Sequence, residues 1–172
     1  NAFYTFATTT VNITIRQAAV QDEKDHSKAQ YEEGRKMTDF SLTDIDGNTY
    51  QLSDLCAEKQ LIVLDFWYTT CEPCKMEFPY FESAVQKYGD KLSLLAVNPI
   101  NDDRAMSALR QQFGSSITFP LLKDTCNLSL GFDVTTYPVT VFIDGNGRIM
   151  EIHDGAFLSK SDFLATVKKY LG

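Results

Sequence analysis

The chain has 172 residues, with a hydrophobic content of 44%, an aromatic content of 12% and a formal net charge of -7. This length and composition predict one globular domain with an extension and exclude an intrinsically disordered chain. The acidic balance and the lack of a basic stripe in the sequence argue against a nucleic-acid partner, because phosphate binding depends on clustered Lys and Arg.

An N-terminal extension, residues 1–36, precedes the main domain at residues 37–172. Apolar and polar residues alternate from Thr8 to Arg16, which predicts an edge strand with one buried face. Residues 17–36 are mostly polar and predict a linker or an exposed helix that ends at Gly34. No apolar run reaches about 18 residues and no basic segment precedes an apolar core, so we expect neither a transmembrane helix nor a signal peptide in this sequence.

Strand and helix patterns alternate through the main domain. Asp46-Gly47-Asn48 predicts the turn of a β-hairpin between strands at residues 40–44 and 49–52. The apolar run from Leu61 to Trp67 predicts a central strand that is covered on both faces. The remaining predicted strands are Leu92–Val97, Ile117–Leu122, Val139–Ile143 and Arg148–His153, and the predicted helices are Pro73–Tyr88 with a kink at Pro79, Asp102–Phe113, and a closing helix from Ser159 to Tyr170. This order predicts an α/β sandwich with a mixed sheet.

Two cysteines separated by two residues stand where the central strand turns into a long predicted helix, in the sequence Cys71-Glu72-Pro73-Cys74. Cysteines at this spacing and position form a redox-active dithiol. The free N–H groups and the partial positive charge of a helix N-terminus stabilise a thiolate, so Cys71 is the predicted nucleophile. Cys74 lies one helical turn further on and is the predicted resolving thiol. The negative charge of Glu72 opposes the thiolate, which favours a reductant.

Several separated motifs resemble the ResA/TlpA-like extracytoplasmic branch of the thioredoxin-fold oxidoreductases. The motifs that carry this resemblance are Phe66-Trp67, the Cys-Glu-Pro-Cys sequence with the following Lys75–Pro79, the segments Phe40–Leu42, Asp46-Gly47 and Leu52–Leu55, and in the closing half Phe132–Val134, Tyr137–Thr140 and Phe142–Asp144 with Gly147. The resemblance extends over about residues 37–172. It implies a thioredoxin-like three-layer α/β/α sandwich with a mixed central sheet and an N-terminal β-hairpin extension.

The resemblance also implies an activity, partners and a location. The expected enzyme reduces protein disulfides outside the cytoplasm through the Cys71-Cys74 dithiol, with no other cofactor. A membrane thiol-disulfide reductant similar to DsbD or CcdA would reduce the enzyme again, and the haem-binding cysteines of apocytochrome c are a candidate substrate. The branch further implies a periplasmic monomer whose full-length precursor is anchored in the membrane.

Two acidic residues near the cysteines are candidate catalytic groups. Asp65 lies inside the apolar run, where burial of a carboxylate costs several kcal/mol unless its pKa rises. Its position matches the buried acid of thioredoxins, which implies a proton acceptor for Cys74, although ResA-like members more often have a neutral residue there. Glu77 matches an acid that ResA-like proteins place beside the site, and its spacing puts it on the same helix face as Cys74. The alternatives are a strand-end aspartate bonded to backbone or water, and a solvated glutamate.

The predicted substrate contacts come from two parts of the chain. Pro138 precedes a strand at the position where thioredoxin-fold proteins carry a cis-proline that faces the cysteines, so the resemblance implies that Tyr137 contacts the substrate. An ordinary trans-proline is the alternative. Trp67, Glu72 and Pro73 complete the candidate substrate-binding set, with Trp67 either in the core or in the wall of the substrate pocket.

Two further cysteines and two histidines have less specific interpretations. Cys56 and Cys126 form either a disulfide or second redox pair, or two separate thiols, and the family topology favours separate thiols at opposite ends of the sheet. His26 and His153 lie far apart in the sequence and are predicted to be surface residues, so we expect no metal site.

Two other functions are compatible with the same fold. A peroxiredoxin-like peroxidase would have a threonine three residues before its reactive cysteine and a proline upstream, but Tyr68 holds the threonine position and the proline is missing. A copper-binding assembly factor without enzymatic activity would space its cysteines one residue wider and add a histidine ligand. The sequence therefore favours thiol-disulfide exchange.

Overall fold

The computed structural model describes residues 30–172, which fold around a five-stranded mixed sheet in the order β5-β4-β3-β6-β7. Strands β3 to β5 run parallel, and β6 and β7 pair antiparallel to their neighbours. The strands are β3 (Leu61–Phe66), β4 (Leu92–Asn98), β5 (Leu121–Lys123), β6 (Val139–Asp144) and β7 (Ile149–Asp154).

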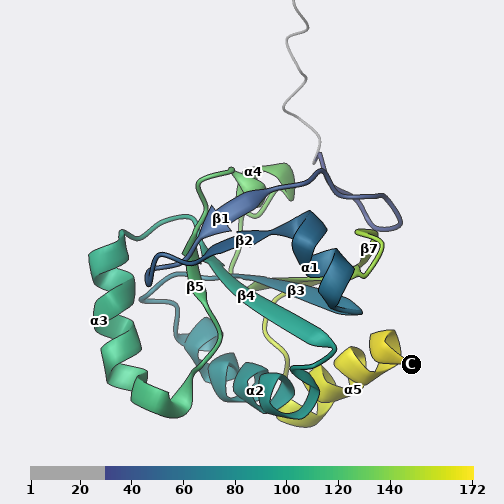
Figure 1. The fold of residues 1–172 in the computed structure, drawn as a ribbon. Coiled ribbons are helices and arrows are strands. Elements are labelled where there is room, and N and C mark those ends of the chain that lie inside the picture. Colours follow the sequence, from purple (N-terminus) through teal and green to yellow (C-terminus); the bar gives the residue numbers. More distant parts are fainter. Residues whose placement is uncertain (1–29) are drawn as a thin grey trace, which may run out of the picture.

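Helices cover both faces of this sheet, so the expected three-layer sandwich is confirmed (Figure 1). The helices are α1 (Leu52–Glu58), α2 (Glu72–Tyr88), α3 (Asp103–Phe113), α4 (Leu128–Gly131) and α5 (Lys160–Leu171), with a short 3-10 turn at Gly114–Ser116. A small hairpin of β1 (Ser41–Thr43) and β2 (Thr49–Gln51) lies with α1 and α4 on one side, opposite α2 and α5. Between residues 30 and 172, no helix combines the length and the apolarity needed to cross a membrane.

Strand β3 is buried along its whole length, which explains why all of its residues except Asp65 are apolar. Alternate side chains pack on opposite faces: Leu61 and Val63 belong to the core under α2 and α5, and Ile62 and Leu64 to the core under α1. The same alternation turns Asp65 toward α2. The central strand therefore carries one carboxylate into the layer that holds the cysteines.

The helix boundaries follow from capping residues. The Cys71 side chain caps α2 by accepting a hydrogen bond from the Cys74 N–H, and the Asp102 and Ser159 side chains cap α3 and α5. Pro79 lies inside α2, which continues to Tyr88 as expected. The cap at Ser159 confirms the predicted start of the closing helix.

Some elements differ from the sequence-based expectation. The predicted strand Ile117–Leu122 starts too early, because pairing with β4 begins only at Leu121, and Ile117 instead packs in the core. Helices α1 and α4 were not expected, since both are too short to show a helical period. Residues 30–36 form no helix. The predicted strand Thr8–Arg16 lies outside the described residues, and so does most of the predicted linker.

The N-terminal part of the described chain covers both edges of the sheet. The Gly34 N–H donates to Ile149 O and the Ile149 N–H donates to Arg35 O along β7. At the opposite edge, the Ile45 N–H donates to Leu121 O on β5. Unpaired strand edges are templates for aggregation, so this segment also protects the sheet.

We predict that Phe81→Ala destabilises the protein by about 3–5 kcal/mol, because the ring is fully buried and truncation leaves a cavity. Phe81 contacts Phe78, Phe119 and Phe163, so its truncation removes packing between α2 and two neighbouring segments. Urea unfolding of the oxidised protein measures the change. Leu158→Ala serves as the control, since this side chain is 94% exposed and its loss should change stability by less than about 0.5 kcal/mol. A small effect of Phe81→Ala would contradict the packing described here.

Candidate active site

A disulfide between Cys71 and Cys74 marks the centre of the site, with 5.3 Å between the two Cα atoms. Strand β3 ends at Phe66, and a short loop leads from it to Cys71 at the start of α2. The Cys74 N–H points at the Cys71 sulfur from 3.3 Å. Pro73 has no N–H group, so the Cys74 N–H is the first one of the helix interior that can reach this sulfur. The helix N-terminus thus directs positive charge at Cys71.

Pro138 and the disulfide lie at the same end of the sheet, where the parallel strands β3 and β4 finish. Val139 pairs with Phe66 in the register of β6 and β3, which places the residue before Val139 beside the loop after Phe66. The Tyr137-Pro138 peptide bond is cis, as expected, and Pro138 is buried. The Tyr137 ring meets the Tyr68 ring edge-on, with 5.2 Å between the centroids. Burial raises the pKa of the Tyr137 hydroxyl, so this ring is neutral in the physiological range.

Asp65 is fully buried in β3, near this end of the sheet. Desolvation, and then the nearby charge of Glu77, raise the pKa of the Asp65 carboxyl well above its ordinary value. The Thr140 hydroxyl lies 3.5 Å from Asp65 Oδ1, and Oδ2 has no hydrogen-bond partner among residues 30–172. Asp65 is thus buried in the strand rather than exposed, and its carboxyl holds a proton more readily than an exposed aspartate.

Glu77 is the second buried acid and lies one turn after Cys74 on the buried face of α2. Its Oε1 accepts a hydrogen bond of 2.6 Å from the Phe157 N–H, and Oε2 has no partner within the described part of the chain. Burial raises the pKa of the Glu77 carboxyl to about 7. Glu77 is thus not a solvated helix carboxylate, and its proton affinity suits exchange near neutral pH.

The other predicted substrate contacts divide between core and surface. Trp67 has no exposed surface and packs edge-on against Phe78, so it occupies the core, the first of its two expected places. Glu72 and Pro73 are exposed beside the disulfide. Glu72 Oε1 lies 2.5 Å from Lys75 Nζ, and this ion pair offsets the charge that Glu72 brings to the helix N-terminus.

The structure adds residues that the sequence did not single out. Thr140 reaches Asp65 because the two residues are register partners in β6 and β3. The Phe157 N–H reaches Glu77 from a loop 80 residues further along the chain, and no pattern in the sequence signals this contact. Tyr68 could have been found from its place in the loop before Cys71, which the topology sets against Tyr137.

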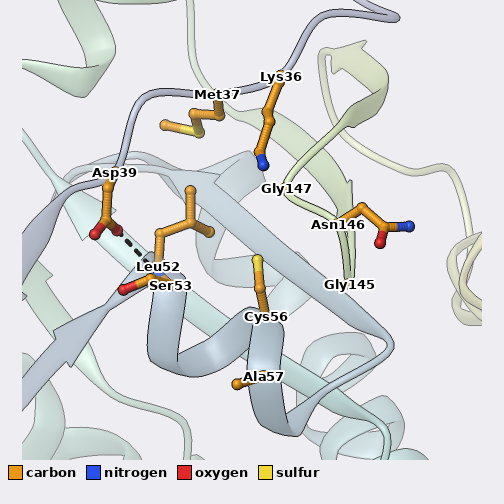
Figure 2. Close-up of a pocket in the computed structure, with 10 residues that line it drawn as sticks. All are labelled: Lys36, Met37, Asp39, Leu52, Ser53, Cys56, Ala57, Gly145, Asn146 and Gly147. Carbon is orange, nitrogen blue, oxygen red and sulfur yellow. Dashed lines mark hydrogen bonds between the residues drawn. The ribbon is translucent and has the colours of Figure 1, made fainter.

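Cys56 and Cys126 are both free, which confirms two separate thiols. Cys56 lies on α1, before β3 begins, and Cys126 follows the end of β5, so the two cysteines are at opposite ends of the parallel strands. The Cys56 sulfur faces a cavity of about 500 Å³ between α1 and the β6–β7 turn (Figure 2). Burial raises the pKa of this thiol. The cavity lies at the end of the sheet opposite the disulfide.

His153 is the only histidine within residues 30–172. The His153 ring is partly exposed and stacks on the Phe157 ring, with 3.9 Å between the centroids. His26 lies outside the described residues. Within residues 30–172, no three His, Cys, Asp or Glu side chains are grouped as a metal site would need.

We predict that the stability of the oxidised protein falls as the pH rises from about 4.5 to 7, the ordinary and the folded-state pKa of Glu77. Because folding raises the pKa of Glu77, the folded chain binds more protons than the unfolded chain in this range. The free energy of unfolding then falls by at most about 1.4 kcal/mol per pH unit for each such group. Asp65 acts in the same direction.

Urea titrations of the wild type and of Glu77→Gln across this range measure the effect. The glutamine keeps an oxygen that can accept the Phe157 N–H but cannot ionise, so its decline with pH should be shallower. The comparison of the two proteins cancels the contribution of titrating groups that do not interact with Glu77, and it includes the part of the Asp65 shift that the Glu77 charge causes. Parallel curves would show that Glu77 ionises as freely in the folded protein as in the unfolded chain.

Comparison with known proteins identifies relatives of this chain. The sequence profile of the AhpC/TSA family matches residues 34–152. The thioredoxin-like protein YneN of Bacillus subtilis is 34% identical, over 75% of this chain and 75% of its own length. The thiol-disulfide oxidoreductase ResA of the same organism is 30% identical, over 82% of this chain and 79% of its own length.

Solved structures show the same fold. A Chlorobium tepidum protein described as the thiol:disulfide interchange protein DsbE has a TM-score of 0.71 and 26% identity, and covers 82% of this chain and 99% of its own. The pneumococcal exposed lipoprotein thioredoxin Etrx1 of Streptococcus pneumoniae has a TM-score of 0.63 and 27% identity, with 77% and 99% coverage. The resemblance to ResA-like proteins is thereby confirmed. The chain belongs to the AhpC/TSA family and is a thioredoxin-fold enzyme of thiol-disulfide exchange, similar to ResA and DsbE.

Proposed function

We propose that this enzyme reduces disulfides of protein substrates outside the cytoplasm, with Cys71 as nucleophile and Cys74 as resolving thiol. The observation that carries the proposal is the Cys71–Cys74 disulfide at the N-terminus of α2, beside Pro138 and above two buried acids. An extracytoplasmic location is supported by the likeness to Etrx1, which is an exposed lipoprotein. A protein substrate is supported by the likeness to thiol-disulfide oxidoreductases.

The first step is attack by the Cys71 thiolate on one sulfur of the substrate disulfide. The substrate S–S bond breaks, a mixed disulfide forms with Cys71, and the other substrate sulfur leaves as a thiolate. The Cys74 N–H, 3.3 Å from the Cys71 sulfur, stabilises the negative charge that the free thiolate carries. Only the thiolate is the nucleophile, so this contact supports Cys71 rather than Cys74 in that role.

The second step releases the substrate. Cys74 gives up its proton, its thiolate attacks the Cys71 sulfur, and the second substrate sulfur leaves as the Cys71–Cys74 disulfide forms. Two electrons pass from the enzyme dithiol to the substrate. We assign Asp65 as acceptor of the Cys74 proton, with Glu77 sharing the role, because both raised pKa values lie closer to that of a thiol.

Tyr137 and Pro138 are the proposed contacts with the substrate backbone. The cis peptide and the buried Pro138 lie at the same end of the sheet as the disulfide, and the Tyr68–Tyr137 ring pair forms an aromatic wall there. An extended peptide could pair with backbone groups at this point. The exposed Glu72 and Pro73 would contact the rim of the same substrate.

The working direction needs an external electron donor. We propose a membrane thiol-disulfide reductant similar to DsbD or CcdA as the donor dithiol, a membrane-anchored precursor, and a monomeric enzyme. The haem-binding cysteines of apocytochrome c are one candidate substrate. The charge of Glu72 gives little support for this direction, since Lys75 offsets it.

We predict that Cys74→Ser accumulates a stable mixed disulfide with its substrate, whereas Cys71→Ser forms none, because only Cys71 carries the assigned nucleophile. Nonreducing gels and mass spectrometry of the trapped complex measure this. Cys126→Ser is the matched control, since this thiol is exposed and free in the structure. A mixed disulfide through Cys74 in the Cys71→Ser protein would reverse the assignment.

The reduction potential of the Cys71–Cys74 pair tests the direction. A value of roughly -250 mV or lower is expected of a dedicated reductant, and a value of about -120 to -180 mV would point to an oxidase or isomerase. Consumption of hydrogen peroxide faster than reduction of a protein disulfide would favour the peroxidase alternative instead.

We predict that Asp65→Asn slows resolution of the mixed disulfide at pH 7 on the order of 10²-fold, the size of a typical general-base contribution. The defect should shrink as the pH rises, because Cys74 then ionises without help. Stopped-flow measurement of the second step provides the rate. Asp54→Asn is the control, since this carboxylate is exposed on α1. Unchanged resolution in Asp65→Asn would remove Asp65 from the mechanism.

A further inference from the structure

Two asparagines form a hydrogen-bonded bracket at the end of β4. Asn98 is fully buried, and its Oδ1 accepts bonds from the Ile100 N–H at 3.0 Å and the Asn101 N–H at 2.8 Å. Its Nδ2 donates to Asn101 Oδ1 at 3.2 Å. All three bonds lie within four residues, so the bracket folds the β4–α3 connection back on the last residue of the strand.

The bracket also reaches the loop that carries Cys71. Asn101 Oδ1 accepts a second hydrogen bond, of 2.9 Å, from the Thr69 N–H, 32 residues earlier in the chain. One residue before Thr69, the Tyr68 carbonyl accepts the Cys71 N–H at 3.0 Å. A continuous path of hydrogen bonds and one peptide unit therefore connects the buried end of β4 to the nucleophile.

The same loop carries part of the proposed substrate wall. The Tyr68 ring meets the Tyr137 ring edge-on, and Tyr137 precedes Pro138. A shift of Thr69 would move Tyr68 relative to Tyr137 as well as the backbone before Cys71. The position of one side-chain oxygen on the β4–α3 connection thus affects both the nucleophile and the surface that receives a substrate.

We propose that Asn101 is a positioning residue for thiol-disulfide exchange: it holds Thr69, and through Thr69 the loop that sets Cys71 against Tyr137. Asn98 orients Asn101 for this role. The inference deepens the proposed function and rests on it for the nature of the substrate. Misplacement of a reacting group by about 1 Å can cost on the order of 10²-fold in rate, so a single fixed acceptor in this loop matters.

The chemistry of the two amides predicts different tolerance to substitution. Asn101 uses only its oxygen in the recorded bonds, as acceptor from Thr69 N–H and from Asn98 Nδ2. An aspartate at this position can accept both bonds. Asn98 instead accepts through its oxygen and donates through its nitrogen, so Asn98→Asp would lose the donor and bury a carboxylate against the oxygen of Asn101.

The test compares Asn101→Ala, Asn101→Asp and the control Asn146→Ala. Asn146 is an exposed residue in the β6–β7 turn, at the opposite end of the sheet. Asn101→Ala should lower kcat/KM for the reduction of insulin disulfides roughly tenfold, the factor that corresponds to about 1.4 kcal/mol. It should leave alkylation of reduced Cys71 by iodoacetamide within twofold at the high-pH plateau, because that small reagent needs no docking. Asn101→Asp should restore most of the loss, and Asn146→Ala should match the wild type.

Amide hydrogen exchange at Thr69 gives a second readout that does not depend on the substrate. Exchange should accelerate at least fivefold in Asn101→Ala and return toward the wild-type rate in Asn101→Asp, since only the latter restores an acceptor for this N–H. If wild-type protein fails to reduce insulin, the proposed function is in doubt while the exchange data still judge the role of Asn101. Wild-type kinetics and exchange in Asn101→Ala, or equal defects in the alanine and aspartate variants, would overturn the inference.

Discussion

The desolvation of Asp65 in the central strand constrains the chemistry of the whole site. Its carboxyl group lies between β3 and α2, and its one hydrogen-bond partner among residues 30–172 is the Thr140 hydroxyl at 3.5 Å. An ionised carboxylate in such surroundings is unfavourable by several kcal/mol, so the group holds its proton at a higher pH. This brings its proton affinity toward that of a thiol, which is what a proton acceptor for Cys74 requires.

Glu77 extends this constraint to the helix that carries the cysteines. Its charge raises the pKa of Asp65, because two nearby carboxylates are unfavourable when both are ionised. Asp65 therefore retains its proton to a higher pH than it would without the neighbouring acid. The Phe157 N–H holds one Glu77 oxygen, so the loop before α5 fixes where the second acid lies.

The scaffold positions these groups by bringing distant segments of the chain to one end of the sheet. β3 contributes Asp65 and leads into Cys71, while β6 contributes Thr140 and begins next to Pro138. The parallel strands β3 and β4 finish at the same end of the sheet, so β4 places its asparagine bracket beside the loop before Cys71. Reactive groups on loops gain precision when neighbouring strands hold those loops by specific hydrogen bonds.

The sequence by itself determined the fold class, the redox pair and most long elements. Cys71 and Cys74 were evident because their chemistry depends on spacing and on a helix start, which are local properties. The mostly apolar β3 and the periodic α2 were predicted for the same reason. The short helices α1 and α4 and the true start of β5 were not, since tertiary contacts rather than local pattern set them.

Only the tertiary structure decided how the buried polar groups are satisfied. The sequence placed Asp65 and Glu77 near the cysteines but left each either buried or solvated, because burial depends on what packs above a residue. The partners of these groups, Thr140 and Phe157, come from parts of the chain 75 and 80 residues away. A sequence pattern records distances along the chain, whereas the pKa of a carboxyl and the geometry of a loop depend on contacts through space.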